Sequence, residues 1–380
     1  MKVTGDWLNR PATQAVLSML SGAGYQAVFV GGCVRNALLG VEVSDIDIAT
    51  DARPETVTRL AKAAGLKTVG TGIEHGTVTV VAGRIPHEIT TYRRDVTTDG
   101  RRASVAFSDD MARDARRRDF TMNALYAAAD GTVIDPLGGL PDLRARRVRF
   151  IEDPGQRIRE DYLRSLRFFR FHAWYGDPGL GPDAEGLAAV AAHIDGLAQL
   201  SRERVGAEML KLLAASDPAP SVAAMRQAGV LNAVLPGADD QGLAPLVHLE
   251  GALDPDPIRR LAILGGADVA IRLRLSRAQE KALAGLRNGI GAATEPGELG
   301  YRLGLDAARD VLLLRAAIAG QSMDADALGK ARTGAGATFP VKAADLMPAL
   351  QGPALGRRMN MLEARWIASD FTLTRDELLG

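Results

Sequence analysis

The chain of 380 residues is long enough for two or more domains, and its 46 basic and 46 acidic side chains give a formal net charge of zero. No overall field draws such a chain onto nucleic acid, so contact with a polyanion has to come from local patches. The single cysteine, Cys33, excludes an intrachain disulfide framework. The N-terminal segment lacks the apolar core of a signal peptide and no apolar run reaches transmembrane length, so we expect a cytoplasmic protein that contacts no membrane.

The first third of the chain alternates helical and strand-like patterns. In chain order we expect a helix from Asp6 to about Leu20, a strand at 27–30, a glycine turn and a short helix to Leu39, a strand at 45–50, a helix opened by Pro54, and strands at 77–81 and 87–92. The next stretch, 93–118, is polar and rich in arginine, and we expect a mobile loop there.

From about Gln156 onward, apolar residues recur with a helical period, and the chain stays rich in alanine and leucine. We find no convincing fixed-period repeat. The predicted fold class is α+β: an α/β head with a mixed sheet, followed by an all-helical extension.

The strand at 45–50 carries two acids at alternate positions. Asp45 and Asp47 share one face of such a strand, while Ile46 and Ile48 share the other and look buried. Two carboxylates side by side repel each other, and something must compensate that repulsion. They are either solvated acids of an edge strand or ligands of Mg²⁺, which accepts few protein ligands and takes the rest from water and substrate phosphates.

Residues just ahead of the acid pair favour the metal site. Gly31 and Gly32 allow the backbone to approach a ligand closely, and the N-terminus of the following helix attracts phosphate. Arg35, one turn into that helix, can clamp a phosphate through two hydrogen bonds. A phosphate cradle ahead of a metal-holding acid pair is the layout that a nucleotidyltransferase requires. Glu88, on a later strand, is either a third carboxylate or an ordinary exposed acid.

Arginine is concentrated in two stretches despite the neutral total. Residues 144–170 hold nine arginines against four acids, and residues 93–118 hold eight against five. Such stripes can follow a phosphodiester backbone, although a charge run is more often a solvated face. The two stretches therefore only support a nucleic-acid partner.

Five segments, taken in order, resemble the class II tRNA nucleotidyltransferases, which are the CCA-adding enzymes and their close relatives, the bacterial poly(A) polymerases. The segments are GGCVRNALLG with DIDIAT (31–50), RRDFTMNAL (117–125), DPLGGLPDL (135–143), REDYLRSLRFFRF (159–171) and SRERVGAEMLKLL (201–213). The resemblance covers about residues 25–236, and beyond it only the helical character matches. It implies a catalytic nucleotidyltransferase head (1–143), a helical neck for nucleotide selection (144–215), and a helical body and tail that bind tRNA (216–380).

The resemblance also implies roles for individual residues. Asp45 and Asp47 resemble the family's catalytic metal ligands, here for Mg²⁺, and Gly32 and Arg35 resemble its triphosphate contacts. Arg118 and Asp119 resemble the segment that reads the ribose, where an aspartate can bond a 2′-hydroxyl. A helix-capping role for Asp119 and Asn123 is equally compatible with the sequence.

The stretch EDYLR (160–164) is the most informative. On a continuous helix, Asp161 and Arg164 would be neighbours, either as a weak surface ion pair or as a reader of bases. Cytosine and adenine both present an amino donor beside a ring-nitrogen acceptor, which suits an aspartate and an arginine, whereas guanine and uracil leave those groups unpaired. This is the family's proposed use of the motif. Arg167 and Arg170 continue the same face as a cationic ridge toward the triphosphate or the primer.

Two positions depart from the family pattern. Asn36 stands where the family has aspartate after the sequence VR, and we expect metal binding to survive because Asn36 lies outside the acid pair. Tyr162 stands where the family has proline, and this change removes a rigid helix-start residue.

The resemblance implies addition of CMP, CMP and AMP from CTP and ATP to the 3′ end of tRNA, with release of pyrophosphate. A poly(A) polymerase, an enzyme that adds only CC or only A, and an RNA-binding module on an inactive transferase fold remain alternatives. The stretch 69–81 is closer to the CCA-adding pattern, the segment 99–107 looks intact, and the retained acid pair argues against a binding module. We expect no second, hydrolytic activity, and the sequence does not indicate an oligomeric state.

Overall fold

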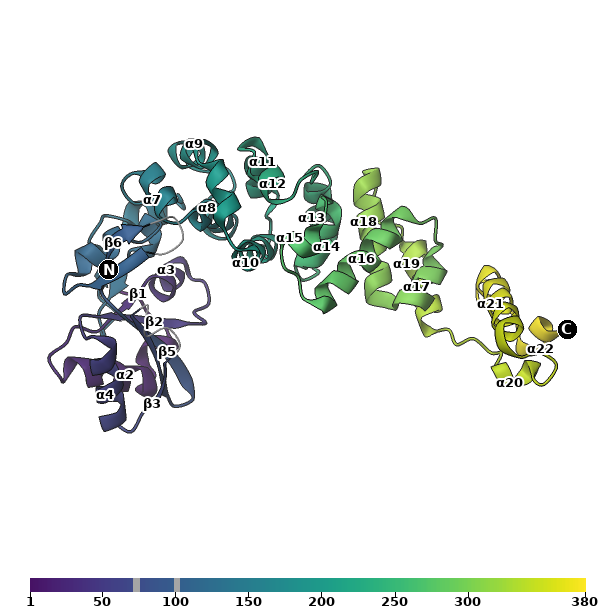
Figure 1. Cartoon of the computed structure of the whole chain (residues 1–380), viewed down its shortest axis with the longest axis horizontal. Coiled ribbons are helices and arrows are strands. Elements are labelled where there is room, and N and C mark those ends of the chain that lie inside the picture. The colour runs from purple at the N-terminus through teal and green to yellow at the C-terminus, as the bar shows by residue number, and fades with distance from the viewer. Residues whose placement is uncertain (71–75, 99–102) are drawn as a thin grey trace. The chain divides into compact units, whose positions relative to one another are not determined.

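The computed structural model describes residues 1–70, 76–98 and 103–380 (Figure 1). The contacts within the chain divide it into two compact units, Met1–Val234 and Leu235–Gly380. Among the described residues, all strands and the helices up to α12 lie in the first unit, and the regular elements of the second unit are helices.

A seven-stranded mixed sheet organises the first unit. Its strands, in the order in which they lie side by side, are β3 (Lys67–Val69), β4 (Thr77–Ala82), β5 (Ile85–Thr91), β2 (Ile46–Thr50), β1 (Val28–Val30), β8 (Tyr126–Ala127) and β9 (Val133–Ile134). Strands β2 and β5 run parallel, and the other neighbours run antiparallel. The predicted strands and the mixed sheet are therefore confirmed.

The central strand β2 has the predicted two faces. Ile46 and Ile48 are buried at 3% and 0% exposure, whereas Asp45, just before the strand, is exposed and Asp47 is half-buried. In the parallel pairing, Asp47 lies opposite Glu88 of β5. The register therefore puts the acids of two strands beside one another.

The first unit starts with two helices, where the sequence predicted a single one. The chain from Asp6 to Leu20 forms α1 (Asp6–Asn9) and α2 (Pro11–Ser21), because Pro11 lacks a backbone donor and opens a new helix at its first position. Helices α2 and α4 (Pro54–Ala63) pack against strands β3 to β5. The others are α3 (Gly32–Leu39), α5 (Met111–Arg116), η2 (Thr121–Asn123), α6 (Leu140–Arg144), α7 (Pro154–Glu160), α8 (Leu163–Tyr175), α9 (Ala184–Ala192), η3 (Ile194–Gln199), α10 (Arg202–Leu213), α11 (Ala219–Gln227) and α12 (Val230–Val234).

The prediction of a mobile loop over 93–118 is wrong. Strands β6 (Arg93–Thr98) and β7 (Ala103–Phe107) pair as an antiparallel ribbon, and α5 follows, with Asp110 accepting at 2.8 Å from the Ala112 amide as its N-cap. The alternation of Ala103, Val105 and Phe107 is a strand signal that the surrounding arginines concealed. Residues 99–102 of the segment judged intact, and 71–75 of the stretch 69–81, lie outside the described residues.

An aromatic cluster joins the sheet region to the helices after it. The ring of Phe150 lies 4.9 Å from that of Phe120 and 5.3 Å from that of Phe168 on α8. All three rings are buried. Buried aromatic area of this kind is among the largest single contributions to a core, so α8 is fixed to the segment that carries Asp119.

The second unit consists of short helices around its own apolar cores. They are α13 (Leu243–Glu250), α14 (Pro257–Leu264), α15 (Val269–Arg272), α16 (Arg277–Gly291), α17 (Pro296–Leu303), α18 (Leu305–Ala319), α19 (Ala325–Gly336), α20 (Ala343–Leu346), α21 (Gly352–Ala368) and α22 (Arg375–Leu379). Buried Glu250 bridges Arg259 at 2.8 Å and Arg260 at 2.6 Å, and Asp310, which pairs with Arg259 at 2.9 Å, supplies the second negative charge. Among the described residues of the whole chain, the helices are too short or too polar to cross a bilayer.

Candidate active site

A cleft of about 720 Å³ lies in the first unit. The side chains that line it come from β2, β5, α3, α8 and α10 and from the segment after α5. They are Gly31, Gly32, Arg35, Asp45, Asp47, Glu88, Arg117, Arg118, Asp119, Asn123, Asp161, Leu163, Arg164, Arg167, Arg170, Phe171, Arg204 and Lys211. Every residue that the sequence predicted for the site is in this set.

The acid pair and Glu88 line the cleft together. Burial, and then the charge of Glu88, raise the pKa of Asp47 to about 6, with Asp45 adding to the effect. Over 1–70, 76–98 and 103–380, no three His, Cys, Asp or Glu side chains form a group that could hold a metal ion. The protein therefore offers two hard carboxylates and leaves other positions open, which is the donor set that Mg²⁺ accepts.

The turn between β1 and α3 depends on Gly31. Its φ of 69° is a conformation that L side chains rarely adopt, and its amide donates to the Leu125 carbonyl at 2.9 Å. A Cβ atom there would lie 3.3 Å from a terminal nitrogen of Arg118, whereas a Cβ at Gly32 would have ordinary contacts. Gly31 thus lets α3 begin at the edge of the cleft.

Arg35 is buried at 6% exposure and is held by neutral groups. Its Nε and Nη2 donate to Asn36 Oδ1 at 3.1 and 2.8 Å, Nη2 also donates to the Tyr175 hydroxyl at 2.8 Å, and Nη1 donates to Asn123 Oδ1. Four of its five N–H donors are used in this way. The phosphate clamp with two hydrogen bonds predicted from the sequence is therefore not available in this conformation, because one donor stays open.

Arg118 and Asp119 both take part in ion pairs. Arg118 donates to the buried Asp114 at 3.0 Å, and Asp119 accepts from Arg167 at 2.7 Å and from the Asn123 amide at 2.9 Å. Burial alone would raise the pKa of Asp119, but the charge of Arg167 and the amide hydrogen bond outweigh it and hold that pKa well below its ordinary value. Asp119 is therefore an ionised acceptor. It orients Asn123 and does not cap the short helix η2, whose N-cap is Phe120.

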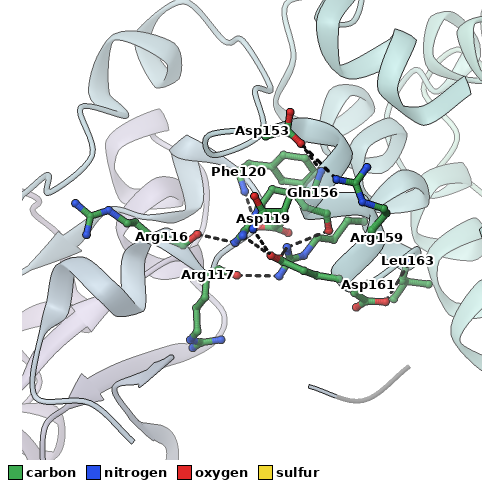
Figure 2. Close-up of polar contacts among 12 residues, drawn as sticks. Arg116, Arg117, Asp119, Phe120, Asp153, Gln156, Arg159, Asp161 and Leu163 are labelled. Atoms are coloured by element: carbon green, nitrogen blue, oxygen red, sulfur yellow. Dashed lines mark hydrogen bonds and ion pairs between the residues drawn. The ribbon is translucent and has the colours of Figure 1, made fainter. Parts of the chain in front are cut away.

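The EDYLR stretch is not one continuous helix, so the predicted side-by-side placement of Asp161 and Arg164 on a helix is wrong. Helix α7 ends at Glu160, Asp161 has an extended conformation with φ −154°, and α8 begins at Leu163. The cause is local: Asp161 Oδ1 accepts from the Leu163 amide at 3.1 Å, which competes with helix continuation (Figure 2). Oδ2 accepts from Arg204 at 2.7 Å.

Arg164 instead joins α8 to the end of α5. It donates to Glu160 at 2.7 Å and to the Arg117 carbonyl at 2.8 Å, while Arg157 donates to the Arg116 carbonyl at 2.8 Å. Figure 2 labels the two residues whose carbonyls accept, Arg116 and Arg117. Cations favour the carbonyl end of a helix. The side chain that was expected to read a base is thus fixed to the segment that carries the β6–β7 ribbon.

The predicted cationic ridge of Arg167 and Arg170 is neutralised. Both line the cleft from α8, but Arg167 pairs with Asp119 and Arg170 pairs with the buried Glu208 at 2.6 Å. A surface of matched charges attracts a polyanion less than a bare ridge does.

Sequence reasoning missed several residues of the cleft. Arg204 and Lys211 of α10 line it, and so does Arg117, while Tyr175 at the end of α8 holds Arg35. Arg204 and Lys211 fall in a segment with a family resemblance, which was a usable signal. Tyr175 had none, because its position beside Arg35 depends on tertiary packing.

Comparisons with known proteins show which families and structures the chain is similar to. The family model for the poly A polymerase head domain matches residues 27–149, and that for the probable RNA and SrmB-binding site of polymerase A matches residues 179–241. A CCA-adding enzyme of Levilactobacillus brevis is 44% identical over 205 residues, which are 53% of this chain and 50% of that protein. The human mitochondrial CCA tRNA nucleotidyltransferase 1 is 45% identical over 184 residues, 48% of this chain and 42% of that one. Each alignment thus spans half or less of the curated relative's length.

The structure of a Bacillus stearothermophilus CCA-adding enzyme in complex with CTP superposes with a TM-score of 0.80 at 27% identity, covering 97% of this chain and 94% of that one. The fold and the cleft define a nucleotidyltransferase head followed by helices. Residues 27–149 and 179–241 match the two domain models of the poly A polymerase family, and the chain has the fold of a CCA-adding enzyme.

Proposed function

We propose that the protein adds CMP, CMP and AMP in turn to the 3′ end of tRNA, using CTP and ATP and releasing pyrophosphate without a nucleic-acid template. One observation carries the proposal: the acid pair of β2 and the polar groups of Asp161 and Arg164 line one cleft. Two curated relatives that the chain resembles are named as a CCA-adding enzyme and a CCA tRNA nucleotidyltransferase.

The acid pair would hold Mg²⁺. Burial, and after it the negative charge of Glu88, raise the pKa of Asp47, and the positive charge of a divalent cation would favour its ionised form. When bound, such an ion stabilises negative charge on the attacking and leaving oxygens of a displacement at phosphorus. Gly31, Gly32 and Arg35 border the same part of the cleft and would receive the triphosphate.

Nucleotide choice would fall to Asp161 and Arg164. Arg164 donates three of its N–H groups to Glu160 and to the Arg157 and Arg117 carbonyls, which leaves two donors for a base. Each Asp161 oxygen has a lone pair left for an amino group. We propose that Arg118 and Asp119 read the ribose and that Arg167 and Arg170 orient the polar groups of the cleft. We also propose that residues 1–143 serve as the catalytic head, 144–215 as the neck, and 216–380 as the tRNA-binding body and tail.

The test supplies the purified protein with tRNA that ends before CCA, together with labelled CTP and ATP. Growth by three nucleotides supports the proposal. A long adenylate ladder on unrelated RNA would instead identify a poly(A) polymerase, and RNA binding without incorporation would identify a binding module.

Asp47→Asn tests the metal assignment, since it keeps the shape of the side chain and removes the charge. We expect a loss of transfer of at least about a hundredfold with tRNA affinity retained, because the carboxylate would act on the reacting phosphate and not on the tRNA body. Transfer at the wild-type rate by this variant would contradict the assignment.

A further inference from the structure

Arg35 differs from the other arginines of the cleft in its partners. Arg117 and Arg118 pair with Asp114, Arg164 with Glu160, Arg167 with Asp119, Arg170 with Glu208, and Arg204 with Asp161. Within the described parts of the chain, no carboxylate lies at ion-pair distance from Arg35, whose acceptors are two amide oxygens and a phenol. Among the described residues, Arg35 is therefore the cleft arginine without a directly bound carboxylate, and Asp119 and Asp47 attract it only from a longer distance.

Such a charge is unfavourable in a buried position. Arg35 is only 6% exposed, and burying a cation without a counter-charge costs free energy. The rings of Tyr175 and Phe171, whose centroids lie 3.9 and 5.1 Å from its guanidinium carbon, offset part of that cost. An anion entering the cleft beside Gly31 and Gly32 would supply the missing counter-charge.

Asn36 decides whether this charge is available. Its Oδ1 accepts from both Nε and Nη2 of Arg35, which is the edge of the guanidinium that a carboxylate grips in a two-pronged ion pair. An aspartate at this position, which the family pattern has, would hold the same edge with a full negative charge. The asparagine holds the edge without neutralising it, while its own amide donates to the Glu42 carbonyl at 3.0 Å.

We propose that Asn36 is a positioning residue that fixes Arg35 while leaving its positive charge free for the triphosphate of the incoming nucleotide. The inference rests on the proposed function, because it assumes that a nucleoside triphosphate is the anion bound in the cleft. It assigns a role to a residue in which this chain departs from the family pattern.

The test compares Asn36→Asp with Asn36→Ala and with Asn288→Asp, an exposed position of α16 in the second unit that makes the same change in net charge. Binding of CTP and of inorganic tripolyphosphate is measured by calorimetry at saturating Mg²⁺. The kcat of transfer and the KM for CTP are measured with tRNA as the primer. Binding of CTP does not require transfer to tRNA. The experiment can therefore contradict the role of Asn36 without contradicting the proposed function, and the reverse.

We expect Asn36→Asp to weaken the binding of both ligands about tenfold and to raise the KM for CTP more than it lowers kcat. The reason is that the lost attraction acts on the bound triphosphate both before and during the reaction. Asn36→Ala should weaken them less, and Asn288→Asp should match the wild type. Equal losses in Asn36→Asp and Asn36→Ala, or unchanged binding in Asn36→Asp, would overturn the inference. A wild-type protein that binds no CTP would instead overturn the proposed function.

Discussion

At the scale of the residue, Asp161 combines two tasks. Its carboxylate caps the turn into α8 and accepts from Arg204, and the proposed function adds an incoming base. In Asp161→Ala the acceptor for the exocyclic amine is lost, so discrimination of CTP against UTP, measured as the ratio of kcat/KM values, should fall about tenfold or more.

The matched control for that change is Asp195→Ala, an exposed acid of η3. It should keep both the discrimination and the affinity for tRNA. If Asp161→Ala lost tRNA affinity and kept its discrimination, Asp161 would be a tRNA contact and not a base reader.

Single residues also show what the sequence could predict. The alternation of Asp45, Ile46 and Asp47 fixes which side chains face the cleft, since a strand has only two faces, and this prediction is confirmed. The hydrogen bonds of Arg35 were not predictable. They depend on Asn123 and Tyr175, which are distant in sequence and meet Arg35 only in the folded unit.

At the scale of the element, the break between α7 and α8 sets the position of Asp161. Tyr162 forms the break, and its ring lies over Gly196 of η3, where an added Cβ would come within 2.0 Å of the ring. Gly196→Ala should therefore displace Tyr162, lower the free energy of unfolding by about 1–3 kcal/mol, and reduce nucleotide discrimination. Chemical unfolding and competition between CTP and UTP would measure the two effects.

Gly285→Ala, in the interior of α16, is the matched control because a Cβ there meets no other atom within 4 Å. It should raise stability by about 0.5–1 kcal/mol through the better helix propensity of alanine. A Gly196→Ala variant as stable and as selective as the wild type would show that Tyr162 does not control Asp161.

A second prediction at this scale concerns the packing of α8 on α11. Burial lowers the pKa of His172, whose Nδ1 lies 2.7 Å from the Ser221 hydroxyl. Below pH 6.5 the unfolded chain binds this proton more readily than the folded one. The contribution to stability is therefore fully present above pH 6.5 and is lost as the pH falls, by at most about 1.4 kcal/mol per pH unit.

Urea unfolding followed by circular dichroism at pH 5.5 and 7.5 would test this loss. His172→Gln should reduce the difference between the two pH values, whereas His248→Gln, at an exposed position of α13, should leave it unchanged. An unaltered difference in His172→Gln would assign the acid sensitivity to other groups.

The break also marks where sequence reasoning reached its limit. The helical period over 159–171 predicts a single helix because it scores side-chain spacing, and it does not register that an aspartate can bond its neighbouring amide. The helical character from about Gln156 onward was predicted from the period of the apolar residues, and α8 and α10 confirm it for their segments.

At the scale of the whole molecule, all residues of the cleft belong to Met1–Val234. A fragment ending at Val234 should fold and bind CTP as the full chain does, but its KM for tRNA should rise by at least about tenfold, because the proposed tRNA-binding segment 216–380 is mostly removed. Circular dichroism, calorimetry and steady-state kinetics check the three parts. A fragment that matched the full chain on tRNA would move the tRNA contacts into the first unit.

The pairing of acids with arginines along the cleft also affects how strongly polyanions other than tRNA bind there. Six cleft arginines lie beside five carboxylates, with Asp114 shared between Arg117 and Arg118; the other four are Arg164, Arg167, Arg170 and Arg204. An arriving strand therefore displaces few condensed counterions, and these arginines contribute little to sequence-independent, salt-sensitive adhesion. Heparin, duplex DNA and bystander RNA should dissociate readily at ordinary ionic strength, so that residence time depends on the shape of the bound end and not on its charge.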